Sequence, residues 1–233
     1  MFQEDTWVAY NKKYKVFSDI ENQEVPNVIF DHWGQRELAK HILKEKNGWK
    51  KNADGIYEKK VAKNPTKTLA ISLYTADVPE LKLTAEAVRK AWADLGVDVE
   101  VKIFDPSELY QNVIRTRSYD ALLFGEAVGK DNDLYAFWHS SQRNAPGLNV
   151  SMYANSKADK ILESIRSSSD VAARAAYWGQ FEQVIAADAP AAFLYAPDFV
   201  YAVPKSLQGV DLGVITSPTD RFASVSDWYT ETE

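Results

Sequence analysis

The chain has 233 residues, of which 45% are hydrophobic and 26% are charged. This composition is typical of a globular protein that can bury a core in one large or two small domains. The net charge of −6, with lysine and arginine scattered along the chain, excludes the basic surface that nucleic-acid binding requires. There is no cysteine, which excludes disulfides, thiolate metal sites and cysteine nucleophiles. The three histidines match no metal-ligand spacing, so we expect surface or packing roles for them, and we predict neither a metal site nor a cofactor.

The first part of the sequence shows few regular patterns. No apolar run approaches the roughly 18 residues of a membrane span, and the first residues lack the apolar region of a signal peptide. Residues 1–33 show no sustained period, which predicts an irregular segment. Apolar residues then recur at helical spacing over residues 34–47, and Gly48 can end that helix. Asp54 and Gly55 lie between two strand-like arms and predict a hairpin.

The middle of the chain alternates strands with helices. Hydrophobic spacing predicts strands at 68–75, 97–104 and 120–125, and helices at 80–95 and 106–117. Gly96 can end the first helix, and Asp105 can cap the second, with Pro106 at its first position and Glu108 completing a capping box. Such a β-α-β-α-β unit predicts parallel strands joined by right-handed crossovers.

Two further helices and two short strands are predicted after residue 150. Ser156 and Asp159 form a capping box at the start of the first helix. The second helix covers about residues 170–188 and ends before Pro190, and its spacing predicts that it buries Tyr177, Phe181, Val184 and Ile185. AAFLYA at 191–196 and FVYAV at 199–203 are typical of strands, and the tail after them is irregular.

The segment 125–149 is the candidate binding loop. Its first residues resemble a phosphate-binding loop, but Gly125 and Gly129 are one residue too close together, and Asp131 stands where a hydroxyl should be. Ligands of parallel sheets bind beyond the carboxyl ends of the strands, and this long loop follows the third strand. Its aromatic and acidic residues predict a pocket for a partly apolar, partly charged small ligand. The alternative is a surface loop that packs its aromatic side chains into its own core.

An ordered set of motifs resembles the extracytoplasmic solute-binding proteins of ABC importers, in their peptide/nickel class (family 5). The set covers roughly residues 34–210 and includes AKHILKEKNGWKKNADGIYEKK, DALLFGEAVGKDNDLYAFWHSSQRNAPGLNVSMYANSKADKILESI and AADAPAAFLYAPDFVYAV. The resemblance implies an α/β, periplasmic-binding-protein-like (type II) lobe, with a mixed, mostly parallel sheet flanked by helices. Members of this family are longer than this chain and close two lobes over the ligand, and this chain is similar to the second lobe only.

The resemblance also implies a domain organisation and partners. Residues 1–33 would be an irregular segment from the inter-lobe region, residues 34–210 the solute-binding lobe, and residues 211–233 a tail leading back toward a missing lobe. We therefore read the chain as a fragment whose Met1 is introduced. The expected partners are a peptide or other small-molecule solute and a membrane-embedded ABC permease. The expected location of the full-length protein is extracytoplasmic, in the periplasm or lipid-anchored at the cell surface.

The implied ligand-binding residues lie in and around the candidate loop. They are Phe124, Gly125, Glu126, Asp131, Asp133, Tyr135, Trp138 and Asn149. We expect Tyr135 and Trp138 to lie near the carboxyl end of the sheet and to remain exposed on the surface that faces the missing lobe. Peptide-binding members carry a Gly-Trp pair followed by an Asp that grips the α-amino group, whereas this sequence has Glu126 and Gly129 at those positions. Glu126, Asp131 or Asp133 could substitute for the missing Asp.

Several functions stay open at this stage. An oligopeptide ligand is favoured, while nickel chelates, sugars and other solutes are alternatives within the same class. A ligand-sensing module of a regulator is a second possibility. A hydrolase that uses paired carboxylates of the loop is a third, but the sequence has no Gly-x-Ser-x-Gly, no His-Glu-x-x-His and no placed histidine or cysteine base. We therefore predict a binding protein and not an enzyme.

Overall fold

The computed structural model describes residues 4–10, 48–60, 66–128, 133–196, 199–213 and 215–230. The predicted helix at 34–47 lies outside these residues. The chain divides into two compact units: Val8–Phe124 with Leu134–Ala192, and Met1–Trp7 with Gly125–Asp133 and Phe193–Glu233. The division falls within three strands, β1 (Glu4–Tyr10), β7 (Ala121–Ala127) and β8 (Ala191–Tyr195). Strand β1 lies in the segment predicted to be irregular. None of the helices within the described ranges has the length and apolar character needed to cross a bilayer.

The main sheet has five strands in the order β6-β5-β7-β1-β8. Strand β5 (Ala70–Ala76) pairs in parallel with β6 (Asp98–Phe104) along its whole length, from Ala70 opposite Asp98 to Ala76 opposite Phe104. It also pairs in parallel with β7, where Leu73 lies opposite Ala121. The predicted parallel arrangement of these three strands is confirmed. Because β6 is an edge strand, the inward alternation predicted for it is incomplete, and Ile103 is exposed.

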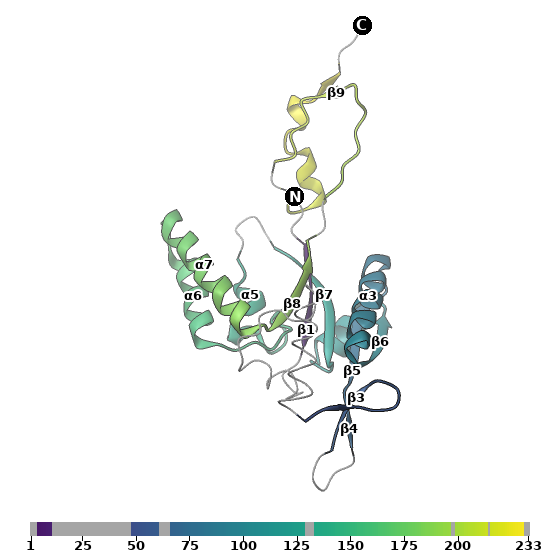
Figure 1. The fold of residues 1–233 in the computed structure, drawn as a ribbon. Coiled ribbons are helices and arrows are strands. Elements are labelled where there is room, and N and C mark those ends of the chain that lie inside the picture. The colour runs from purple at the N-terminus through teal and green to yellow at the C-terminus, as the bar shows by residue number, and fades with distance from the viewer. Residues whose placement is uncertain are drawn as a thin grey trace. The chain divides into compact units, whose positions relative to one another are not determined.

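Helix α3 (Pro79–Leu95) packs on β5 and β6, as Figure 1 shows. The side chains of Ala85, Val88, Trp92 and Leu95 recur at helical spacing and are buried, as predicted. Gly96 ends the helix in the left-handed conformation (φ 103°), and its N–H donates to the carbonyl oxygens of Trp92 and Ala93. This positive φ lets the chain turn directly from the helix into β6.

We predict opposite effects for the same substitution at two glycines. A Cβ on Gly96 would lie 2.8 Å from the carbonyl oxygen of Gly55, whereas one on Gly179, within helix α7 (Val171–Asp188), would have no atom within 4 Å. Gly96→Ala should therefore destabilise the fold by about 1–3 kcal/mol. Gly179→Ala should stabilise it by about 0.5–1 kcal/mol, because alanine restricts the unfolded chain. Urea unfolding followed by circular dichroism measures both changes, and two shifts of the same sign would contradict the assignment.

The second crossover differs from the predicted helix at 106–117. Asp105 caps it through Ser107 N (2.8 Å) as expected, but the α-helical part α4 (Pro106–Glu108) lasts only three residues. A π-helix, η2 (Leu109–Ile114), follows, in which Leu109, Val113 and Ile114 are buried. The hydrogen bond from Arg115 N to the Tyr110 carbonyl oxygen (2.9 Å) spans five residues, as in a π-helix. Val113 and Ile114 follow Leu109 by four and five residues, and in a π-helix these spacings place all three side chains on the buried side. The 3.6-residue period of an α-helix does not predict this arrangement.

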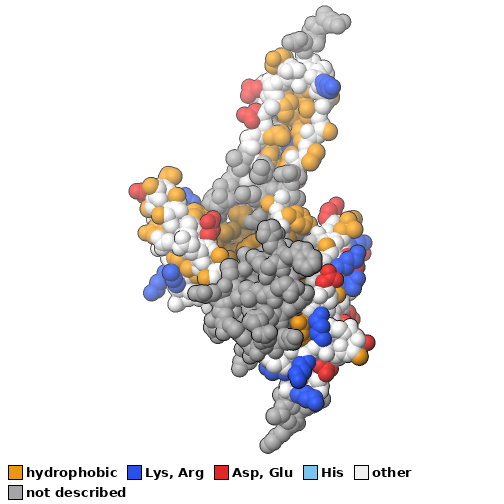
Figure 2. Space-filling model, viewed as in Figure 1, with side chains coloured by type: hydrophobic (Ala, Val, Ile, Leu, Met, Phe, Trp, Pro, Cys, Tyr) orange, Lys and Arg blue, Asp and Glu red, His pale blue; other side chains and the backbone are white. Residues whose placement is uncertain are grey.

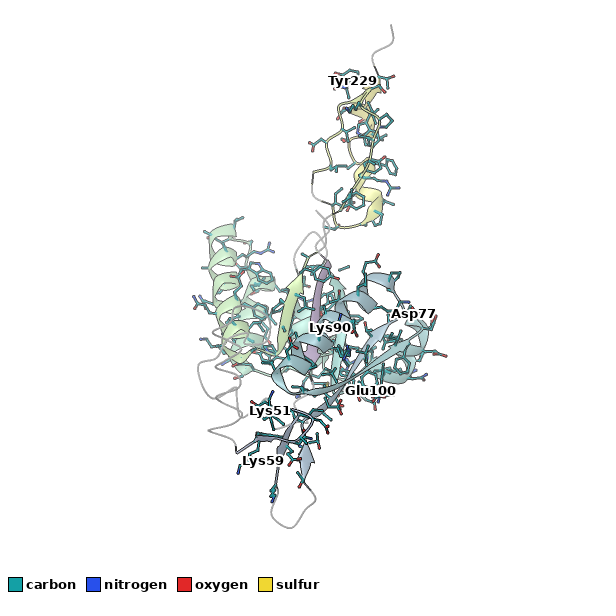
Figure 3. All side chains as sticks on the ribbon, turned by 45° about the vertical axis from the view of Figure 1, so that its right-hand side comes forward. Lys51, Lys59, Asp77, Lys90, Glu100 and Tyr229 are labelled. Carbon is teal, nitrogen blue, oxygen red and sulfur yellow. The ribbon has the colours of Figure 1, made fainter. Side chains whose placement is uncertain are left out.

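A small antiparallel sheet contains the predicted hairpin. Its strands are β2 (Lys50–Lys51), β3 (Tyr57–Lys59) and β4 (Lys67–Thr68). Gly55 adopts a positive φ (80°) in the turn between β2 and β3, which confirms the hairpin signal. Figure 3 shows Lys51 and Lys59 on this sheet, with Lys90 on α3 and Glu100 on β6.

Two packed helices complete the larger unit, namely α6 (Ser156–Ser167) and α7. They lie side by side in Figure 1, and α6 also contacts the short helix α5 (Tyr135–Trp138). Phe181, Val184 and Ile185 of α7 are buried as predicted, whereas Tyr177 is only half-buried. The predicted end of α7 is also confirmed, because Ala189 caps it in the left-handed conformation.

The C-terminal part of the smaller unit differs from the prediction. Residues 199–203 form no strand, and their aromatic rings instead pack against residues near the end of the chain. Tyr201 contacts Phe199, Phe222 and Trp228 with ring centroids 6.2–6.4 Å apart, and Figure 2 shows hydrophobic side chains along this segment. The same part of the chain contains the helices η4 (Pro218–Phe222) and η5 (Val225–Asp227) and the antiparallel strands β9 (Leu207–Gln208) and β10 (Tyr229–Thr230). The tail is therefore more regular than expected.

Candidate functional site

The predicted site residues belong to two different compact units. Gly125, Glu126 and Asp133 lie in the smaller unit, whereas Phe124, Tyr135, Trp138 and Asn149 lie in the larger one. Asp131 lies outside the described residues.

The acidic residues lie at and after the carboxyl end of β7. Glu126 is on the strand and is buried, with 4% of its surface exposed, and Asp133 is half-buried. Gly125 precedes Glu126 and is half-buried, as is Phe124. Because β7 is parallel to β5, these residues lie at the end of the strand where parallel sheets bind ligands. Two carboxylates in one short segment can pair with a cationic group of a ligand.

Trp138 does not lie on an exposed ligand-binding surface. It ends α5 and is buried, with 2% of its surface exposed, and its ring meets that of Tyr153 edge to face at 6.3 Å. The expected exposure of Trp138 is therefore wrong. The alternative weighed from the sequence, a loop that packs its aromatic side chains into its own core, describes this residue correctly.

Asn149 has a structural role because its amide is fully used within the protein. The side chain is completely buried, and Nδ2 donates to the carbonyl oxygens of His139 (3.1 Å) and Tyr153 (3.0 Å). Oδ1 accepts from Ser151 Oγ (3.1 Å) and Tyr153 N (3.0 Å). Two donors and two acceptor positions exhaust what an asparagine amide offers. The Asn149 side chain therefore has no donor or acceptor position left for a ligand.

Tyr135 is held between two other side chains. Its ring stacks on His139 at 4.0 Å, and the Arg166 guanidinium of α6 lies 3.9 Å from the ring centroid. His139 is buried, its Nδ1 accepts from Ser141 N (3.1 Å), and its Nε2 lies 3.5 Å from Glu163 Oε1. These contacts join α5 to α6. They confirm the packing role expected of His139, while His32 and His41 lie outside the described residues.

A partly buried polar network connects α6 and α7. Asn155 caps α6, in place of the predicted Ser156, and accepts from the backbone N–H groups of residues 157 and 158. The sequence assigned Asp159 to a capping box. Its carboxylate instead accepts hydrogen bonds from the backbone N–H (2.9 Å) and the hydroxyl (2.6 Å) of Ser140. At the end of α7, Asp188 Oδ2 accepts from Asn155 Nδ2 and Tyr153 Oη, both at 2.5 Å.

Sequence reasoning missed this network because its partners are distant in the sequence, and those of Asp188 are more than 30 residues away. Burial and the neighbouring Asp188 carboxylate together raise the pKa of Tyr153 well above its ordinary value. The network therefore keeps the tyrosine protonated, which lets its hydroxyl donate to Asp188. Because Tyr153 and Asn155 both bind Asp188, the network fixes the position of the loop before α6.

Tyr119 leads to a prediction at high pH. Its buried hydroxyl donates to the Val150 carbonyl oxygen, and burial raises its pKa to about 12, against the smaller opposing effect of Arg117. The unfolded chain releases this proton near pH 10 and the folded chain near pH 12, so stability falls as pH rises between these values. We expect the free energy of unfolding of the wild-type chain to fall by about 2 kcal/mol relative to that of Tyr119→Phe over this range. Urea unfolding of both proteins at pH 9 and 11.5 measures this difference, and parallel pH profiles would contradict it.

Comparison with known proteins identifies the family. The model of "Bacterial extracellular solute-binding proteins, family 5 Middle" matches residues 3–146, more than half of the chain. The chain belongs to this family. Family 5 is a family of binding proteins, which agrees with the resemblance noted from the sequence. A curated relative, the oligopeptide-binding protein AppA of Bacillus subtilis, is 33% identical over 177 residues, covering 73% of this chain and 31% of AppA.

Solved structures establish the fold of this family 5 chain. It superposes on B. subtilis AppA, solved with a nonapeptide, with a TM-score of 0.72 at 23% identity, over 100% of this chain and 51% of AppA. NikZ of Campylobacter jejuni, solved with Ni(L-His), gives 0.71 at 19% identity, over 99% of this chain and 52% of NikZ. DppA of Helicobacter pylori, solved with the peptide STSA, gives a TM-score of 0.63 at 18% identity, over 99% of this chain and 48% of DppA. The fold is periplasmic-binding-protein-like, type II, and the chain spans about half the length of these structures.

Proposed function

We propose that this chain is a ligand-binding lobe of an extracytoplasmic receptor that delivers an oligopeptide-type solute to an ABC importer. The observation that carries the proposal is the 33% identity with an oligopeptide-binding protein over 177 residues. The proposed role is binding without chemical conversion of the solute. The proposed partner is a membrane-embedded permease, which would receive the solute from the full-length protein outside the cytoplasm.

The segment after β7 is the proposed contact with the peptide's α-amino group. Glu126 and Asp133 lie in one compact unit, and Asp131 lies between them in sequence. A carboxylate attracts an ammonium group strongly where water is excluded, and Glu126 is buried at the end of its strand. Gly125 remains a proposed neighbour of the ligand in the same unit, and Phe124 and Tyr135, which belong to the larger unit, stay predictions from the sequence. Trp138 and Asn149 instead support the loop that precedes α6.

Native mass spectrometry and calorimetry test this proposal. The 233-residue chain, purified without denaturation, is first examined for a retained ligand and then titrated with a nonapeptide, with the same peptide N-acetylated, and with Ni(L-His)₂. We expect the free-amino peptide to bind, and acetylation to weaken binding at least tenfold, because a charge-assisted hydrogen bond is lost. Equal binding of both peptides would contradict the role of the carboxylates. Binding of the nickel complex alone would contradict the oligopeptide assignment.

Variants identify the carboxylate that binds the amino group. Glu126→Gln, Asp131→Asn and Asp133→Asn each remove a negative charge with little change in shape, and Glu108→Gln makes the same change at an exposed position on α4. At least one of the first three should weaken the free-amino peptide about as much as acetylation does, without affecting the acetylated peptide. The control variant should bind both peptides like the wild type. Wild-type affinity in all three test variants would show that the amino group binds elsewhere.

A further inference from the structure

The structure has a surface cavity of about 250 Å³, and none of the residues that line it is among those assigned to the solute. Its lining residues are Tyr110, Arg115, Ala145 and Pro146. Tyr110 belongs to the π-helix η2, Arg115 follows it directly, and the other two belong to the loop after the 3₁₀ turn η3 (Ser140–Gln142). All four lie in the larger compact unit.

The two walls of this cavity are tied together by Arg117. This residue adopts a positive φ (54°), unusual for a residue other than glycine. Its guanidinium donates to the carbonyl oxygens of Ile114 (2.5 Å), Arg143 (3.0 Å) and Gly147 (2.6 Å). The first of these carbonyls ends η2, and the other two flank Ala145 and Pro146. The cavity is therefore formed before any ligand arrives, which reduces the entropy cost of binding.

The surroundings of the cavity favour an anion. Arg115 donates to the side-chain oxygen of Gln111 (3.3 Å), Arg117 to three backbone carbonyls, and Arg143 to the Ser140 carbonyl oxygen (3.0 Å). These acceptors are all neutral oxygen atoms, so the contacts leave the three positive charges in place. A guanidinium can bind a carboxylate through two parallel hydrogen bonds. Arg115 is the arginine that lines the cavity itself.

The remaining lining residues favour a flat, apolar body. Tyr110 is 44% exposed, and Pro146 and Ala145 line the same cavity. The volume is below the roughly 300–1,000 Å³ of pockets for drug-sized ligands, so the occupant is a small molecule. A π-helix is less favourable than an α-helix and occurs frequently at functional sites. Here the π-helix places Tyr110 and Arg115 beside the same cavity.

We propose that this cavity is a second binding site, which takes a small carboxylate with an aromatic or similarly flat apolar body. The carboxylate pairs with Arg115, and the body lies against Tyr110 and Pro146. The site is independent of peptide binding by the segment after β7. It therefore stands even if the proposed solute is wrong.

Nuclear magnetic resonance with benzoate as the probe tests this second site. Benzoate titrated into the ¹⁵N-labelled 233-residue chain should shift the amide signals of residues 109–117 and 143–149. Benzamide, which has the same ring without the charge, should leave them unchanged. A saturating peptide should not displace benzoate. Shifts confined to other residues, no shifts at all, or equal binding of benzamide would overturn the proposal.

Three variants make the assignment specific. Arg115→Gln should raise the dissociation constant for benzoate at least tenfold, because it removes a charge-assisted pair of hydrogen bonds. Tyr110→Ala should also weaken binding. Arg89→Gln removes the same charge from the surface of α3, where Arg89 pairs with Glu86 (2.6 Å), and should leave benzoate affinity unchanged. The unperturbed signals of each variant show whether it is folded, and a folded Arg115→Gln protein with wild-type affinity would overturn the proposal.

Discussion

Trp138→Ala is expected to lower the free energy of unfolding by about 3–5 kcal/mol. The ring is 2% exposed and packs edge to face on Tyr153 in the core of the larger unit. Removing it leaves a cavity that the surrounding helix and loop cannot fill, because Tyr153 is itself held by Asp188. Urea unfolding followed by circular dichroism at 222 nm measures the change.

A matched variant separates packing from ligand contact at this position. Trp178 on α7 is half-buried and contacts Phe181 edge to face at 6.0 Å. Trp178→Ala should therefore lower the free energy of unfolding clearly less than Trp138→Ala does. Trp138→Phe keeps most of the ring volume and should recover a large part of the loss. If Trp138→Ala kept wild-type stability and abolished peptide binding, the tryptophan would be a ligand contact and its assigned packing role would be wrong.

Asn149→Asp is expected to destabilise the fold by about 3–5 kcal/mol at pH 7, although the two side chains have nearly the same shape. The Nδ2 group donates to two backbone carbonyl oxygens, so a carboxylate oxygen in its place would face two acceptors in a completely buried position. Asn149→Ala removes all four hydrogen bonds without adding a charge and should cost about 3 kcal/mol. Denaturant unfolding of both variants gives these values.

The pH dependence of Asn149→Asp supplies a second measurement. Burial would raise the pKa of the introduced carboxyl in the folded chain, so the folded state would hold a proton that the unfolded state releases near pH 4. The deficit relative to the wild type should therefore shrink as the pH is lowered from 7 to 4. Asn144→Asp, the same change at an exposed loop residue, should alter stability by less than about 0.5 kcal/mol. A deficit that does not depend on pH would contradict the buried charge.

Regular elements with a strong hydrophobic period were predicted correctly. The alternation of Leu69, Ile71 and Leu73 and the helical spacing of Val88 and Trp92 correspond to side chains that are buried. Their partners in the core are close in sequence or on adjacent strands, and Gly96 marks the end of the helix by its own conformational preference. Prediction was wrong where the period changed within an element, as in η2. It was also wrong at residues 199–203, whose apolar residues pack against the C-terminal segment and form no strand.

The candidate loop was predicted as a region, but the roles of its residues were not. Aromatic residues in a long loop are compatible with either a ligand surface or a local core, because both bury apolar area. The same ambiguity applies to Asn149, whose amide could bind a ligand or the backbone. The structure places Trp138 and Asn149 inside the protein and assigns both to the support of α5 and the loop before α6.

By itself, the sequence determined the type of fold, the parallel β-α-β-α-β unit, the hairpin at Gly55 and the resemblance to family 5, because these depend on periods and turn residues that act over a few positions. Only the tertiary structure decided which polar side chains are already satisfied, as with Asp188 bound to Tyr153 and Asn155. It alone revealed the cavity beside Arg115. A hydrogen bond or a cavity wall requires groups from distant parts of the chain at distances of a few ångströms, and no local pattern encodes those distances.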